Sequence, residues 1–183
     1  MHKYMAELHQ DHVNLARLLT ILEQQSKRLD SEDEQPDLLL LVDIAHYIRN
    51  YPDLVHHPKE NIIYEAFARQ SPEAKDVIEE LLSQHHSMPS ATTEFEDMID
   101  SVAHGENIIE KTTLKTRLDE FIELQKTHMD IEEEQLFPLI NQTLTDDDWL
   151  GLEKSLSDAK DPLFGDKIID HYQRLYSYIE QQC

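Results

Sequence analysis

The sequence predicts an all-α protein: a bundle of four long helices followed by a C-terminal helical extension. Three observations predict it. The 183 residues include only three glycines, whereas a β-rich domain of this size uses more glycine in its turns. Apolar residues recur every three or four positions along four long stretches. Each of these stretches also carries a histidine within its apolar stripe.

The first helix is expected over about residues 4–29. Its bundle-facing stripe consists of Met5, Leu8, His12, Leu15, Leu19 and Leu22. The charged segment 30–36 is expected to be a loop. The second helix is expected over about residues 37–69, with Leu41, Ile44, Ile48, His56, Glu60, Ile63 and Phe67 in one phase.

Prolines complicate the second helix. Pro52 is expected to kink or break it, because proline lacks the amide donor and clashes with the preceding turn. Pro58 either begins a new turn or bends the helix, and the sequence leaves both alternatives open. A third helix is expected from the N-cap Ser71 to about Val102, with His85 in its stripe and a local irregularity at Pro89.

The fourth helix is expected over about residues 109–140, with His128 and Glu132 on its apolar face and a bend or end at Pro138. These four helices define a predicted domain, residues 1–140.

Residues 141–183 are expected to form two shorter helices that pack on the bundle. The first is expected near residues 145–158, with Thr145 as its N-cap. The second is expected near residues 165–181, docked through Ile168, Tyr172, Leu175 and Ile179.

Charge and composition exclude several function classes. A formal net charge of −22 repels phosphate backbones and anionic membranes, so neither nucleic acid nor a membrane is an expected partner. No segment approaches the roughly 20 apolar residues that span a bilayer. The single cysteine, Cys183, rules out a disulfide within the chain and cysteine-based metal sites. A cytoplasmic location and a monomer or homodimer are expected.

Histidine is enriched, with 11 residues, and two of the helices carry His-x3-Glu. This spacing places both side chains on one face of a helix. Chance alone predicts roughly one such pair, so the motif by itself is weak. The other two helices each add a stripe histidine, and the spacing repeats: His12 to His56 is 44 residues and His85 to His128 is 43. The candidate metal ligands are therefore His12, His56, Glu60, His85, His128 and Glu132.

Two carboxylates in a bundle core are costly unless they are paired, and a pair of divalent metal ions removes that cost. Taken one at a time, each histidine is better explained as a hydrogen-bonded residue of the core, and each glutamate is better explained as a solvent-exposed helix residue. Taken together, six buried polar groups favour metal. Imidazole and carboxylate suit several metals, with iron expected first and manganese next.

Neighbouring polar residues receive other interpretations. His57 and His86 are expected to lie about 100° out of phase, although a kink at Pro58 or Pro89 would exchange them with their neighbours. His9 is a candidate for a supporting role. Tyr64 either packs in the core or bonds to the site. Glu133 is expected on a solvated face.

The stretches LHQDH, HHPKENIIYEAF, LLSQHH and HMDIEEEQLFPLI resemble the hemerythrin-like family, or HHE cation-binding domains, over about residues 1–140. The resemblance implies an up-and-down four-helix bundle. It also implies two iron ions, oxo- or hydroxo-bridged, in the bundle core. The four histidines would be terminal ligands, and Glu60 and Glu132 would bridge the irons.

The sequence departs from the oxygen-carrying hemerythrins at two positions. Pro89 stands where they have a further histidine, and Glu132 follows His128 at a spacing of four instead of an aspartate at five. One fewer histidine leaves an additional metal position open. The expected function is therefore binding or sensing of O2, NO or peroxide. The alternatives are a peroxide-decomposing or oxidase enzyme and a metal-free helical interaction protein, so enzymatic activity is left open.

Overall fold

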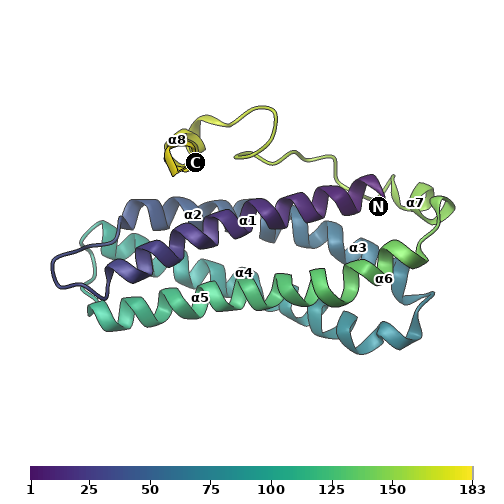
Figure 1. Cartoon of the computed structure of the whole chain (residues 1–183), viewed down its shortest axis with the longest axis horizontal. Coiled ribbons are helices and arrows are strands. Elements are labelled where there is room, and N and C mark those ends of the chain that lie inside the picture. The colour runs from purple at the N-terminus through teal and green to yellow at the C-terminus, as the bar shows by residue number, and fades with distance from the viewer. Residues whose placement is uncertain (183) are drawn as a thin grey trace.

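Four antiparallel helical rods lie side by side in the computed structural model, which describes residues 1–182 (Figure 1). The first rod is α1 (Lys3–Arg28) and the third is α4 (Lys75–Ala103). The second combines α2 (Leu38–Asn50) with α3 (His57–Ala68), and the fourth combines α5 (Lys111–Ile131) with α6 (Phe137–Thr143). The described residues contain no strand. The predicted all-α, up-and-down bundle is confirmed.

The second and fourth rods each contain one π-helical turn, η1 (Pro52–His56) and η3 (Glu132–Leu136). A proline follows each turn at the second position of the next helix, Pro58 in α3 and Pro138 in α6. Proline has no amide to donate and its ring clashes with the carbonyl four residues earlier. A π turn widens the helix at that point, so the rod continues where an α-helix would break.

The third rod differs from its prediction at both prolines. A 3-10 turn, η2 (Pro72–Ala74), precedes α4, and Ser71 makes no capping hydrogen bond through its side chain. Ser71 is therefore the N-cap and Pro72 the first helical residue, as expected, but the Ser71 side chain does not cap the turn. Pro89 lies within α4 without interrupting it, so the expected irregularity is absent there.

Two apolar clusters fill the bundle, one toward each end. The first contains the middle and later residues of α1 with most of α2 and α5. The second contains the start of α1, the end of α3 and α6. Along the first three rods, the candidate ligands lie between these two clusters, and on the fourth rod His128 and Glu132 flank Met129, the last residue of the first cluster there. The polar site is therefore a layer enclosed by apolar packing on both sides.

The chain beyond the bundle forms α7 (Asp146–Leu152), a 3-10 turn η4 (Asp170–Tyr172) and α8 (Gln173–Gln182). The expected cap on α7 is confirmed, because Thr145 and Asp148 form a capping box. The last helix begins later than expected. The segment returns along the bundle, where it buries Leu163, Tyr172, Leu175 and Ile179 (Figure 1).

Within the described residues, no helix combines the length and the apolar character needed to cross a membrane.

Candidate metal centre

The six predicted side chains meet in the middle of the bundle. Each is at most 5% exposed, and the two glutamates are fully buried. They come from all four rods: His12 from α1, His56 and Glu60 from the junction of η1 and α3, His85 from α4, and His128 and Glu132 from the junction of α5 and η3.

The histidines form two pairs. The Nε2 atoms of His12 and His56 are 3.1 Å apart, and those of His85 and His128 are also 3.1 Å apart. With metal–nitrogen bonds of about 2.1 Å, two imidazoles at a right angle on one ion have nitrogens about 3 Å apart. The spacing within each pair therefore suits one metal ion.

Each carboxylate reaches both histidine pairs. Glu60 places Oε1 3.2 Å from Nε2 of His56 and Oε2 3.5 Å from Nε2 of His85. Glu132 places Oε2 3.3 Å from Nε2 of His12 and Oε1 3.2 Å from Nε2 of His85. The two oxygens of Glu60 thus face different histidine pairs, as in a carboxylate that bridges two ions. Oε2 of Glu132 is also 3.3 Å from Nε2 of His128, so this oxygen lies between the two pairs.

Each of the four predicted histidines has a side-chain oxygen of a neighbouring residue beside Nδ1, the ring nitrogen that points away from the centre of the site. Nδ1 of each ring is 2.6–3.0 Å from an oxygen acceptor on a neighbouring side chain. This arrangement leaves the Nε2 lone pair directed at the interior, as in metal-bound histidines. The pairs are His12 with Glu133, His56 with Asp11, His85 with Asn61, and His128 with Gln84.

Sequence reasoning missed these outer partners. Glu133 was expected on a solvated face, but its carboxylate bonds to both His12 and His9. His9 itself is exposed, and it contacts the site only through Glu133. Tyr64 donates its hydroxyl to Oε1 of Glu132 at 2.7 Å, so it is bonded to the site and packed in the core at once.

The two histidines whose roles were left open are placed differently. His86 is exposed, whereas His57 is buried at 3% exposure. The ring of His57 stacks on His85 with a centroid distance of 4.5 Å and lies edge-on to His128 at 5.1 Å. The histidine layer therefore contains five rings.

Charges are distributed unevenly over the layer. Burial acts to lower the pKa of His12, but the neighbouring carboxylates of Glu132 and Glu133 outweigh it and raise that pKa to about 9. Burial is likewise outweighed at His56, where Glu60 and Asp11 raise the pKa to about 10. In the absence of metal, the carboxylates around this half of the layer favour the protonated form of its histidines.

The other half favours neutral imidazoles. Burial lowers the pKa of His128 to about 4, and burial together with the neighbouring His85 lowers the pKa of His57 well below its usual value. Burial acts to raise the pKa of Glu132, but the nearby imidazoles of His12 and His85 reverse this and keep that pKa well below its usual range.

The donor set fits a pair of metal ions. Within the described residues, both oxygens of Glu60 and Oε2 of Glu132 are buried without a hydrogen-bond partner. Such unpaired carboxylate oxygens are costly unless a cation meets them. Two overlapping groups have ligand atoms close enough for one ion each: His12, His56 and Glu60, and His57, Glu60, His85 and His128.

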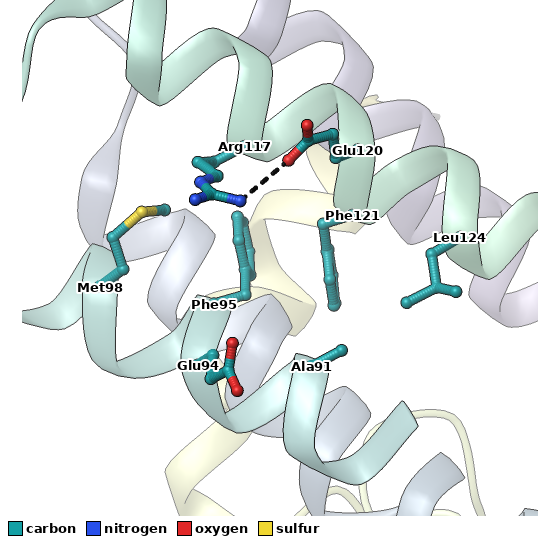
Figure 2. A pocket seen from close by; sticks show the side chains of 8 residues that line it. All are labelled: Ala91, Glu94, Phe95, Met98, Arg117, Glu120, Phe121 and Leu124. Carbon is teal, nitrogen blue, oxygen red and sulfur yellow. Dashed lines mark hydrogen bonds and ion pairs between the residues drawn. The ribbon is translucent and has the colours of Figure 1, made fainter. Parts of the chain in front are cut away.

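A surface groove of about 290 Å³ lies elsewhere, between α4 and α5 (Figure 2). The stacked rings of Phe95 and Phe121 form its floor, with a centroid distance of 4.2 Å, and Arg117 and Glu120 form an ion pair at its rim. None of the candidate ligands lines it. The groove is therefore separate from the metal centre.

Comparison with protein families matches residues 5–140 to the hemerythrin HHE cation binding domain. The matched stretch contains every candidate ligand. Comparisons with curated proteins and with solved structures gave no significant match.

Proposed function

Because the chain belongs to the hemerythrin HHE cation-binding domain family, we propose that it is a non-haem di-iron protein that binds or senses a small oxidant. The ligand class is O2, NO or peroxide. The proposed metal ligands are His12, His56, Glu60, His85, His128 and Glu132. Manganese is the second candidate metal, since it accepts the same donors.

The observation that carries this proposal is the placement of the two buried carboxylates between two imidazole pairs. Glu60 and Glu132 lie inside the site, and the carboxylates of Asp11, Glu133 and Asp53 lie behind its histidines. Two divalent cations would offset most of this negative charge. Without metal, both oxygens of Glu60 and Oε2 of Glu132 make no hydrogen bond among the described residues, and nearby histidines have to balance their charge. This weighs against a purely structural helical protein.

Open coordination positions favour an exogenous ligand. Two imidazoles and one oxygen from each of two carboxylates give an ion four protein donors. Iron sites with about six positions and incomplete protein ligation are typical of oxygen chemistry. When bound, the iron pair would supply the electrons for reaction with an oxidant.

The protein's own groups prepare this site. The apolar clusters on both sides exclude bulk water, and the outer oxygens hold each imidazole with Nε2 facing inward.

Gln125 lies on α5 one turn before His128, fully buried, and neither atom of its amide has a partner among the described residues. It is the side chain we expect to hydrogen-bond a polar ligand entering the site.

The test is elemental analysis of protein expressed in iron-rich medium, with a visible spectrum before and after exposure of the reduced form to O2, NO and peroxide. We expect about two irons per chain and a spectral change with at least one of the three. Glu132→Gln should lose iron, while Glu134→Gln, an exposed neighbour, should retain it.

Wild-type protein that folds fully and takes up no iron or manganese would overturn the proposal. Steady turnover of peroxide, well above the rate with free iron, would instead support the enzyme alternative. Neither result depends on the identity of the physiological partner.

A further inference from the structure

His57 is placed among the metal ligands although the helical phase of the sequence points it elsewhere. Its side chain is 3% exposed and contacts His85 and His128 through their rings. Together with Glu60, these three histidines form a group whose ligand atoms all lie within 4.8 Å of one another.

We propose that His57 is a fifth nitrogen ligand of the site, binding through Nε2 the ion held by His85 and His128, with Asp53 as its outer partner. The inference rests on the proposed metal pair and assigns a residue to it.

The orientation of the ring supports this assignment. Nδ1 of His57 faces Oδ1 of Asp53 at 3.4 Å, and both side chains are buried. The other four histidines of the layer show the same arrangement, with an oxygen behind Nδ1 and Nε2 directed inward. A histidine with Nδ1 toward a carboxylate has Nε2 available for a metal ion.

An ordinary buried histidine would have a different environment. Such a ring normally satisfies its nitrogens with hydrogen bonds. Here Nδ1 of His57 and both oxygens of Asp53 lack a hydrogen-bond partner among the described residues, although they face each other. A metal ion on Nε2 would make Nδ1–H a stronger donor, and a small closure of the 3.4 Å gap would complete the bond to Asp53.

The π turn explains how two consecutive histidines both reach the interior. Neighbouring residues of an α-helix point about 100° apart, so one of them would leave the core. In η1, the amide of His57 bonds to the carbonyl of Pro52, five residues back, and this wider turn ends at His56. His56 faces the pair formed with His12, and His57 faces the pair formed by His85 and His128.

The fifth nitrogen makes the two metal positions unequal. The ion at His85 and His128 would have three imidazoles and two carboxylate oxygens, whereas the ion at His12 and His56 would have two imidazoles and two carboxylate oxygens.

The test measures metal binding without relying on activity. Metal-free wild type, His57→Ala and the similarly sized His57→Gln are titrated with Co(II) under anaerobic conditions, with chelator competition and visible spectra. His86→Ala is the matched control, because His86 is the exposed neighbour of His85. Circular dichroism of the metal-free forms verifies folding.

We expect wild type and His86→Ala each to bind two Co(II) ions. Each ion should bind to the variant with the same affinity as to wild type. In both His57 variants, one of the two ions should bind at least about 100-fold more weakly and its spectrum should change. Asp53→Asn should lower the affinity for the same ion about tenfold, which is typical when the hydrogen-bond partner of a metal ligand is replaced. Free imidazole should restore the wild-type spectrum of His57→Ala.

Two outcomes would overturn the assignment, and they are distinguishable. If wild type binds two ions and His57→Gln binds them with unchanged affinity and spectrum, His57 is not a ligand, while the proposed metal pair stands. If wild type binds no metal, the proposed function itself fails and the assignment falls with it.

Discussion

The oxygen atoms behind the histidines decide which ring nitrogen is available inside the bundle. Glu133 holds Nδ1 of His12 at 2.8 Å, and burial of its carboxylate is outweighed by His12 and His9, which lower its pKa. Neighbouring Glu134 is exposed. The run of three glutamates that begins at Glu132 therefore divides into an inner residue, a supporting residue and a solvated residue.

Removal of the supporting carboxylate should weaken metal binding. We expect Glu133→Ala to lower the affinity for one Zn(II) ion about 10- to 100-fold, because His12 loses the bond that orients its ring. Chelator competition measures the affinity. Glu134→Ala should match wild type, and equal losses in both variants would show that general surface charge, not the bond to His12, sets the affinity.

The roles of single residues were predictable where helical phase determines them. His12, His56, His85 and His128 follow from apolar stripes, because a bundle helix buries one face. Asp11 and Asn61 do not follow from any stripe. Each acts on a histidine of another helix, so its role depends on how two rods pack, which a single sequence does not encode locally.

Among the elements, the two interrupted rods and the C-terminal segment differed most from the predicted helices. The stripes located the rods, but they could not distinguish a kink from a π turn at Pro52.

The segment from 153 to 172 was harder to predict, because side-chain hydrogen bonds hold it and apolar periodicity does not. Asp161 accepts bonds from the hydroxyl of Tyr47 and from the amides of Leu163 and Phe164.

Asp161 should therefore anchor α8 on the bundle. We expect Asp161→Ala to cost about 1–3 kcal/mol of stability, because a buried hydroxyl and two amides lose their acceptor. Hydrogen exchange should speed up in α8 and in the segment before it, with metal content unchanged. Asp158→Ala, at an exposed position nearby, is the control. Unchanged protection of α8 would show that its apolar contacts suffice.

The whole molecule combines a strongly acidic surface with a core that carries protons when it lacks metal. The pKa values of His12 and His56 are raised to about 9 and about 10 in the folded chain. Raised histidine pKa values stabilise the metal-free fold fully below about pH 6.5, and this contribution is lost as the pH rises through 9 to 10. Metal has to displace the same protons.

Metal uptake should therefore stabilise the protein more at higher pH. We expect saturating Zn(II) to raise Tm by a larger amount at pH 8 than at pH 6, since fewer protons compete for the imidazoles. Thermal melts at both pH values, with and without Zn(II), measure the difference, and calorimetry in two buffers should detect proton release. An equal gain at both pH values would indicate that His12 and His56 do not bind the metal.

The π turn at Pro52–His56 has a consequence for variation in chain length. A π turn accommodates one residue more than the α-helical turn it replaces, so it can be gained or lost by a single insertion or deletion. Loss of one residue between Pro52 and Val55 would shorten the turn without altering any histidine. One of the two adjacent rings would then rotate out of the interior, so the number of imidazoles available inside depends on local chain length as much as on the histidines themselves.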